Sequence, residues 1–189
     1  MKELILQIKS ISEDFALDPI AVCAFIAVET GGLGFNKITG KIIIQFEPSW
    51  FRKKAPYAPS GLWSVNKVDV QLKEWLAFND AFYKDANAAM ESTSIGLGQI
   101  MGFHFHTLGY DTVGAMWDDA KKGIDRQIWQ ICKFITSNPN LMIALQTSNW
   151  DKVARIYNGS GYKELAVKYN RTPYDISMKQ QYDIYSKLV

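Results

Sequence analysis

The sequence predicts a mainly α domain with a small β element. Apolar residues recur at helical spacing through most of the chain, beginning with the amphipathic stretch from residue 1 to 15. By contrast, Lys41–Phe46 contains three successive isoleucines and has the length of a short buried strand. Because no linker, repeat or low-complexity segment interrupts the 189 residues, we expect one domain, 1–189, of about eight helices. The first helix, 1–16, is expected to pack on the rest.

The second predicted helix, Asp18–Glu29, is almost wholly apolar and therefore suits a position buried on most sides. Asp18 can cap its start, and Pro19 fits its first turn. The pair Gly31–Gly32 can end it, because glycine tolerates the left-handed conformation that is common at helix ends. This places Glu29 in the last turn of a buried helix.

The middle of the chain is expected to contain an irregular wall, a long helix and a glycine-rich turn. Prolines and a glycine break the segment Trp50–Trp63, which could form a wall of a groove. Val68–Met90 is mostly helical in pattern, with a break expected near Asn79-Asp80. The closely spaced glycines of Glu91–Gly102 predict a tight turn or small hairpin. The remaining predicted helices are Thr112–Lys122, Ile124–Ser137, Pro139–Gln146, Asn149–Tyr157, Tyr162–Tyr169 and Asp175–Leu188.

The composition excludes several classes of partner. With a formal net charge of +2 and no block of Lys or Arg, the chain is not expected to bind nucleic acid. No apolar run is long enough to span a membrane, so stable membrane insertion is not expected. Residues 1–5 lack the pattern of a signal peptide, which predicts synthesis in the cytoplasm. We expect a monomer.

Cysteine and histidine usage predicts neither a metal site nor a disulfide framework. Cys23 and Cys132 lie in apolar helical patterns and are expected to be small buried hydrophobes. His104 and His106 alternate, but two histidines without a third ligand make a poor metal site. Since no phosphate-binding loop is present either, no cofactor is expected.

Glu29 is the residue whose predicted surroundings suggest a catalytic role. The helix dipole disfavours a negative charge in the last turn, and an apolar wall raises the pKa of a carboxyl group by desolvation. A glutamate that stays protonated near neutral pH can act as the general acid of a glycosidase. The alternative is a partly exposed glutamate that merely ends a helix.

Three stretches together point to a family: VETGG at the end of the buried helix, STSIGLGQIMGF in the glycine-rich turn, and ARIYNGSGY at a later helix end. This set resembles the N-acetylmuramidase family of phage and prophage endolysins. The family belongs to the lysozyme-like superfamily, with goose-type lysozymes and lytic transglycosylases. The resemblance spans Pro19–Tyr185 and implies an α+β lysozyme-like fold with the small β element beside an active-site cleft. Ile95 departs from the pattern where the family often has Trp, and His104 where it often has Asn.

The resemblance implies a peptidoglycan hydrolase that lyses bacterial walls, with Glu29 as the catalytic acid. The implied bond is the β-1,4 link between N-acetylmuramic acid and N-acetylglucosamine. The expected sugar contacts are Ser94, Gln99, Ile100, Tyr157, Asn158 and Tyr162. The amide groups of Gln99 and Asn158 suit N-acetyl and hydroxyl groups, although both also suit turns and caps. Family members often carry a separate wall-binding domain, for which this chain has no room, and the substrate would be reached only after release from the cytoplasm.

A second carboxylate is needed for the common glycosidase mechanisms, and Glu47 is the leading candidate. The family places an acidic residue in a Phe-Glu context after a strand, here Phe46-Glu47. The alternative is a structural carboxylate that accepts hydrogen bonds from the loop Gly31–Gly40. Glu91 is a rival for the same role, but we expect it to end a helix and to brace Ser92 or Ser94.

Several other side chains have two possible roles. Thr93 and Ser94 could hold a water molecule or the Glu29 carboxyl group, or could form turn hydrogen bonds with the backbone. Trp50 and Trp63 could be flat platforms for sugar rings, or core residues.

Two other functions remain open on the sequence alone. In a lytic transglycosylase the acetamido group of the substrate replaces the second carboxylate, and the product is an anhydro-sugar. A non-catalytic module of a phage tail or secretion system would bind peptidoglycan without cutting it.

Overall fold

The computed structural model describes residues 2–67 and 70–188. Within these ranges it contains eleven α-helices and one three-stranded sheet, which confirms the mainly α class but corrects the expected helix number of about eight. The chain divides into two compact units. Unit 1 comprises Met1–Gly32 and Ile128–Val189, and unit 2 comprises Leu33–Gln127.

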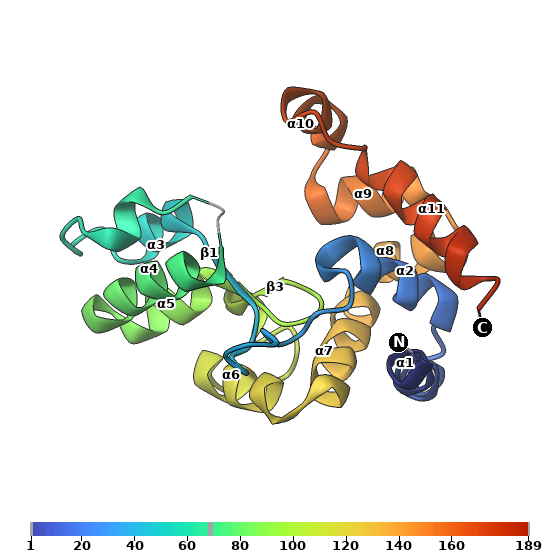
Figure 1. Cartoon of the computed structure of the whole chain (residues 1–189), viewed down its shortest axis with the longest axis horizontal. Helices are drawn as coiled ribbons and strands as arrows, with labels where there is room; N and C mark the ends of the chain where they lie inside the picture. The colour runs from blue at the N-terminus through green and yellow to red at the C-terminus, as the bar shows by residue number, and fades with distance from the viewer. Residues whose placement is uncertain (1, 68–69, 189) are drawn as a thin grey trace. The chain divides into compact units, whose positions relative to one another are not determined.

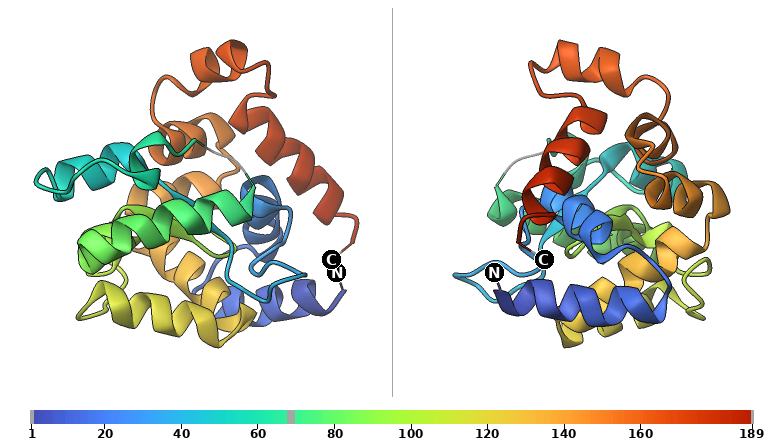
Figure 2. Two further views of the ribbon diagram at one scale, coloured as in Figure 1. Left: turned by 60° about the vertical axis from the view of Figure 1, so that its left-hand side comes forward. Right: turned by 90° about the vertical axis from the view of Figure 1, so that its right-hand side faces the viewer.

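All the regular elements in the described part of unit 1 are helices. They are α1 (Lys2–Asp14), α2 (Pro19–Thr30), most of α7 (Ile124–Thr136), α8 (Pro139–Gln146), α9 (Trp150–Asn158), α10 (Tyr162–Lys168) and α11 (Tyr174–Tyr185). The apolar helix α2 is central: α1 lies on one side of it, and α11 packs against it on another (Figures 1 and 2). Within unit 1, α1 therefore packs on α2.

Unit 2 surrounds a small antiparallel sheet. Its elements are β1 (Ile44–Phe46), α3 (Pro48–Lys54), the 3₁₀-helix η1 (Leu62–Val65), α4 (Gln71–Lys84), α5 (Ala86–Glu91), β2 (Thr93–Ile95), β3 (Ile100–Met101), the 3₁₀-helix η2 (Gly102–His104) and α6 (Val113–Lys122). The strand order is β1-β2-β3, and Ser94 of β2 pairs with Gln45 on one side and with Met101 on the other. The glycine-rich stretch is therefore a hairpin, as its composition predicts.

Two local predictions in unit 2 are wrong. The segment Trp50–Trp63 is not irregular throughout, because it contains most of α3 and the start of η1. Helix α4 has no break at Asn79-Asp80, and the predicted helix start at Val68 lies outside the described residues. Asp80 instead accepts a hydrogen bond from the Trp63 backbone N–H at 3.0 Å and pairs with Lys84, so it joins α4 to η1. The actual break is Asp85, whose carboxylate caps α5 by accepting from the Ala88 N–H at 2.8 Å.

The core contains both cysteines and one of the two tryptophans for which the sequence allowed two roles. Cys23 and Cys132 are 1% and 0% exposed and carry free thiols, as expected. Trp63 is only 2% exposed, its indole N–H donates to the Pro59 carbonyl at 2.8 Å, and its ring packs on Phe51 at 4.8 Å. Trp63 is therefore a core residue and offers no platform to a sugar. Among the described residues, no helix is both long and apolar enough to cross a membrane.

Candidate functional site

Glu29 lies in the last turn of α2, whose two ends are set by the capping residues that the sequence predicts. At its start, the Asp18 carboxylate accepts a hydrogen bond from the Ile20 N–H at 2.9 Å. At its end, Gly31 adopts a left-handed conformation with φ of 61°, and its N–H donates to the Ala27 carbonyl at 3.0 Å. A residue with a Cβ would be strained there, so glycine fixes the point at which the helix stops.

Glu29 lies against two tyrosines of unit 1. The Tyr174 hydroxyl donates a hydrogen bond to Glu29 Oε1 at 2.5 Å. The ring of Tyr157 packs at 6.0 Å from that of Tyr174 and at 4.8 Å from that of Phe25, which closes an aromatic wall beside the carboxyl group. Burial raises the pKa of Glu29 to about 7, while the hydrogen bond from Tyr174 acts in the opposite direction.

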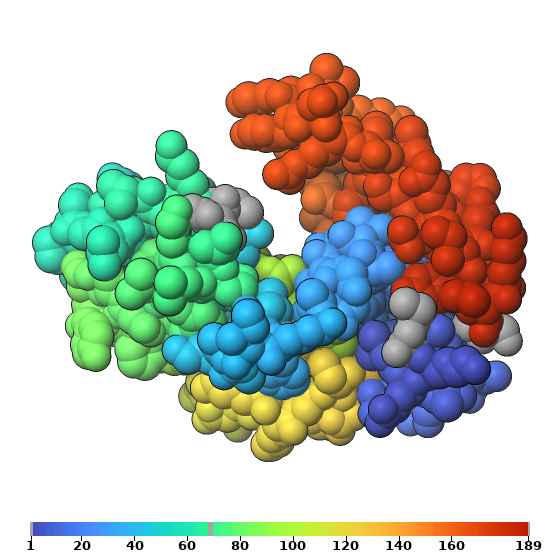
Figure 3. Space-filling view, viewed as in Figure 1, coloured from blue at the N-terminus to red at the C-terminus, as the bar shows by residue number. Residues whose placement is uncertain are grey.

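The C-terminal turn of α2 is reached from the surface. Ala27 to Thr30 are half-buried, whereas the preceding residues from Ala21 to Ile26 are fully buried. In the space-filling view, blue atoms of this part of the chain lie uncovered beside the red atoms of α11 (Figure 3). Glu29 thus combines a raised pKa with access to the surface, which a general acid requires.

The other predicted site residues of unit 1 differ in exposure. Tyr157 is half-buried in the aromatic wall, and Asn158 is exposed at the end of α9. Tyr162 is 4% exposed, and its hydroxyl donates to Asp151 Oδ1 at 2.8 Å. The Tyr162 ring therefore has almost no surface for a sugar, and the residue instead joins α10 to α9.

In unit 2, the predicted sugar-binding residues of the hairpin form a hydrogen-bonded turn. The Ser94 hydroxyl donates to Gln99 Oε1 at 3.0 Å and to the Gln45 carbonyl at 3.4 Å. The Gln99 amide donates to the Gly96 carbonyl at 2.9 Å, and Gln99 has a positive φ of 45°. The side chain of Ile100 is 3% exposed, so only its backbone is available to a ligand.

A glutamine that sequence reasoning missed fastens this turn from α7. Gln127 is 2% exposed; its Oε1 accepts from the Leu97 N–H at 2.9 Å, and its amide donates to the Ala120 carbonyl at 3.0 Å. A Cβ at Gly96 would lie 2.8 Å from Gln127 Oε1. The glycine is thus required by close approach as well as by its φ of +67°. Ile95, which stands in place of the family's Trp, is buried in β2.

Glu47 follows β1 and precedes α3, at the edge of the same hairpin. Its backbone N–H donates to the Ser92 carbonyl at 2.9 Å, and its carboxylate accepts from the Gln45 amide at 2.7 Å. The partner of this carboxylate is therefore Gln45, which lies two residues away on β1.

Glu91 ends α5 as expected, but its carboxylate pairs with Lys54 of α3 instead of bracing Ser92 or Ser94. Ser94 is occupied by Gln45 and Gln99, and the Ser92 hydroxyl is buried without a partner among the residues described. Thr93 forms the expected backbone bond, donating to the Ala89 carbonyl at 2.8 Å. Of the two rival carboxylates, Glu91 is the one already neutralised by a cation.

An aromatic surface lies one turn beyond Glu47. Trp50 is 39% exposed and packs on Phe103 of η2 at 4.8 Å, and Lys53 Nζ lies 4.6 Å from the centre of the Trp50 ring. The QIMGF motif thus supplies Phe103 to this surface. Trp50 keeps the exposure that a sugar platform requires, in contrast to Trp63.

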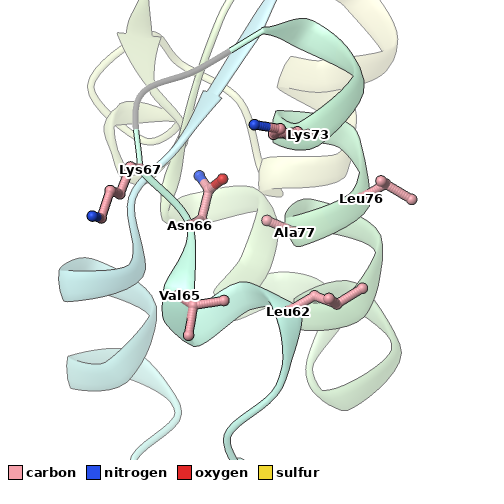
Figure 4. A pocket seen from close by; sticks show the side chains of 7 residues that line it. All are labelled: Leu62, Val65, Asn66, Lys67, Lys73, Leu76 and Ala77. Atoms are coloured by element: carbon pink, nitrogen blue, oxygen red, sulfur yellow. The ribbon is translucent and has the colours of Figure 1, made fainter.

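A separate pocket of about 320 Å³ lies between η1 and α4 (Figure 4). Its walls are Leu62, Val65, Asn66, Lys67, Lys73, Leu76 and Ala77, none of which belongs to the predicted site. Asn66 connects the pocket to β1, because its amide donates to the Phe46 carbonyl at 3.2 Å and to Glu74 at 3.1 Å. Glu74, itself 1% exposed, accepts from the Phe46 N–H at 2.8 Å, so α4 fixes the strand that leads into Glu47.

Residues able to hold a metal ion do not gather in the parts of the chain that the structure describes: no group of three or more His, Cys, Asp or Glu residues has the required spacing. Burial lowers the pKa of His104, which favours the neutral imidazole. The side chains described above as the candidate site carry carboxyl groups, amides and aromatic rings.

Comparison with known proteins agrees with this chemistry. The family model for N-acetylmuramidase matches residues 18–186. The crystal structure of a Burkholderia AP3 phage endolysin is similar to this chain with a TM-score of 0.79 and 28% sequence identity, over 97% of this chain and 70% of the other. A comparison with curated proteins gives no match. Since the family match covers most of both units, the chain belongs to the N-acetylmuramidase family and is a peptidoglycan-degrading glycoside hydrolase.

Proposed function

We propose that this chain hydrolyses the β-1,4 bond between N-acetylmuramic acid and N-acetylglucosamine in peptidoglycan, with Glu29 as the general acid. The observation that carries the proposal is the state of Glu29: a half-buried carboxyl group at the end of α2, with a pKa raised to about 7. At that pKa a large fraction of the group is protonated at neutral pH, and its conjugate base is strong enough to take a proton back.

The proposed reaction uses the ability of Glu29 to give up a proton and to take one back. Glu29 donates its proton to the glycosidic oxygen while the bond from that oxygen to C1 of the muramic acid breaks. The electrons of the bond leave with the oxygen, and the N-acetylglucosamine departs as an alcohol. Water then adds to C1, and its proton returns to the Glu29 carboxylate or to a second carboxylate. The positive charge that develops at C1 calls for such a second carboxylate.

We propose Glu47 for this second role. Its carboxylate is held by the Gln45 amide, whereas the carboxylate of Glu91 is paired with Lys54. A carboxylate that keeps its negative charge uncompensated by a cation stabilises a developing positive centre more strongly.

For the sugar contacts we propose Asn158 at the end of α9, Gln99 in the hairpin and the exposed ring of Trp50. Asn158 is exposed and Gln99 half-buried, and amides match the donors and acceptors of N-acetyl sugars. We also propose Tyr157, in the aromatic wall of unit 1, as a sugar contact. Ser94 and Tyr162 bind the side chains of Gln99 and Asp151, and Ile100 is buried.

The biological role that we propose is that of an endolysin. The similarity to the phage endolysin structure supports it. The family match over residues 18–186 supports a single catalytic domain built from both units. In this role a monomeric enzyme made in the cytoplasm would reach the peptidoglycan after release and lyse the wall.

The experiment that tests this function is product analysis of purified peptidoglycan. Soluble fragments made by the wild type and by Glu29→Gln are reduced with borohydride and identified by mass spectrometry. We expect fragments with reduced muramic acid ends from the wild type and almost none from Glu29→Gln. Anhydro-muramic ends would establish a transglycosylase, and reduced glucosamine ends would contradict the bond assignment. Saturable binding without fragments from the wild type would instead support a non-catalytic peptidoglycan-binding module.

Replacing Glu47 with glutamine is expected to lower the rate of hydrolysis by roughly 10²-fold without changing the products. The substitution removes the negative charge that would stabilise the glycosyl centre, and it keeps the shape of the side chain. Release of reducing ends measures the rate. The matched control is Glu91→Gln, which loses a part-buried ion pair with Lys54, keeps the shape of the side chain, and should keep most of the activity. A Glu47→Gln variant as active as Glu91→Gln would remove Glu47 from the mechanism.

A further inference from the structure

Two tyrosines of α11 bind the two ends of α2. Tyr174 donates its hydroxyl hydrogen to Glu29 Oε1 at 2.5 Å, and Tyr182 donates to Asp18 Oδ2 at 2.9 Å. Residues eight positions apart in a helix fall on the same stripe, so one face of α11 makes both contacts. The first contact reaches the carboxyl group of the proposed acid, and the second reaches the residue that caps the helix.

The two contacts differ in what they hold. Asp18 already accepts a hydrogen bond from the Ile20 N–H, so Tyr182 adds a second bond to a capping group. In unit 1, the titratable groups that face Glu29 are Tyr174 from α11 and Tyr157 from α9. Burial and the charge of Glu29 raise the pKa of both hydroxyls well above 10, so Tyr174 remains a donor at every pH at which the enzyme would work.

We propose that Tyr174 is a positioning residue that decides which oxygen of Glu29 delivers the proton. This inference rests on the proposed role of Glu29 as the general acid. When Glu29 is protonated, the oxygen that accepts the Tyr174 hydrogen bond is the carbonyl oxygen, because a carbonyl oxygen is the better acceptor of a carboxyl group. The acidic proton is then carried by Oε2, and the carboxyl group is held in one orientation.

The same bond also sets the strength of the acid. A hydrogen bond donated to a carboxylate stabilises its charged form more than its neutral form, because charge-assisted hydrogen bonds are the stronger ones. Tyr174 therefore opposes the effect of burial on the pKa of Glu29. Without Tyr174, Glu29 would be a weaker acid in a less fixed orientation.

The test uses Tyr174→Phe and Tyr182→Phe, which remove one hydroxyl group each from the same helix. The pH profile of kcat/KM is measured with peptidoglycan, together with the thermal stability of each variant. Activity falls on the basic side as Glu29 loses its proton. For Tyr174→Phe we expect this basic limb to move up by about 1 pH unit and kcat to fall roughly 10-fold. For Tyr182→Phe we expect the wild-type profile with a comparable loss of stability.

A second substitution makes the test independent of the folding of Tyr174→Phe. Site-specific 3-fluorotyrosine at position 174 keeps the shape of tyrosine and is a stronger donor, so the basic limb should move to lower pH. If neither change at position 174 moves the limb, or if Tyr182→Phe moves it equally, the positioning role is wrong.

Failure of the proposed function has a different signature. In that case the wild type releases no reduced muramic acid ends, or Glu29→Gln releases as many as the wild type. If only the Tyr174 inference fails, the enzyme is active and depends on Glu29, but its pH profile of kcat/KM does not change when the hydroxyl at position 174 is removed.

Discussion

Replacing Glu29 with glutamine is expected to lower the rate of peptidoglycan hydrolysis by roughly 10²–10⁴-fold while the protein stays folded. Glutamine has nearly the same shape as glutamate, and its carbonyl oxygen can still accept the hydrogen bond from Tyr174. It has no proton to give at neutral pH, so the leaving oxygen must depart unprotonated. Release of reducing ends measures the loss, and a variant that keeps a tenth of the wild-type rate would contradict the acid role.

The same substitution should change how stability depends on pH. The folded-state pKa of Glu29 is raised from 4.5 to about 7, so the folded protein favours the neutral carboxyl group. The resulting contribution to the free energy of unfolding is fully present below pH 4.5 and is lost as the pH rises through about 7. Relative to Glu29→Gln, the wild type should therefore lose at most about 3 kcal/mol between pH 4 and pH 8. Urea unfolding at both pH values measures this difference, and equal stability changes in the two proteins would contradict the raised pKa.

Replacing Gly102 with alanine is expected to destabilise the protein by about 3 kcal/mol. A Cβ at this position would lie 2.0 Å from the carbonyl oxygen of Met90 and 3.0 Å from the Cα of Glu91. Both contacts are with backbone atoms at the end of α5, which cannot rotate away as a side chain could. The start of η2 and the end of α5 must therefore separate, and Phe103 and Glu91 would shift with them.

Gly114 provides the matched control for this substitution. It lies in α6, has no positive φ, and a Cβ there would meet only Thr112 Oγ1 at 3.8 Å. Because alanine is the better helix former, Gly114→Ala should be neutral or stabilising by up to about 1 kcal/mol. Denaturant unfolding at one pH compares the two variants. A Gly102→Ala protein as stable as Gly114→Ala would contradict the close packing of η2 on α5.

Local signals in the sequence were sufficient for the elements that they fix directly. Helix α2 begins after Asp18 and ends before Gly31, as predicted, because each of these residues interacts with a backbone group only a few residues away. The closely spaced glycines of the hairpin predicted a turn for the same reason, since glycine tolerates a positive φ without help from distant residues. These local rules placed Glu29 at the end of a buried helix without any knowledge of the fold.

Contacts between residues that are far apart in the sequence could not be predicted from such local signals. Tyr174 lies 145 residues from Glu29 and belongs to no motif, so its contact exists only once α11 packs on α2. Asp80 resembles a helix breaker in the sequence, but the N–H of Trp63 and the ammonium group of Lys84 keep it inside α4. Trp50 and Trp63 are equivalent in sequence terms, and only packing shows that one is exposed and the other buried.

The most direct test of the acid role is a titration of the Glu29 carboxyl group itself. Carbon-13 labelling of glutamate side chains allows each carboxyl group to be followed by NMR as the pH changes, and Glu29→Gln assigns the signal by its disappearance. We expect one glutamate with a pKa of about 7 that is present in the wild type and absent from the variant. If the signal that disappears titrates near 4.5, the ordinary value, then Glu29 is ionised at neutral pH and cannot be the general acid.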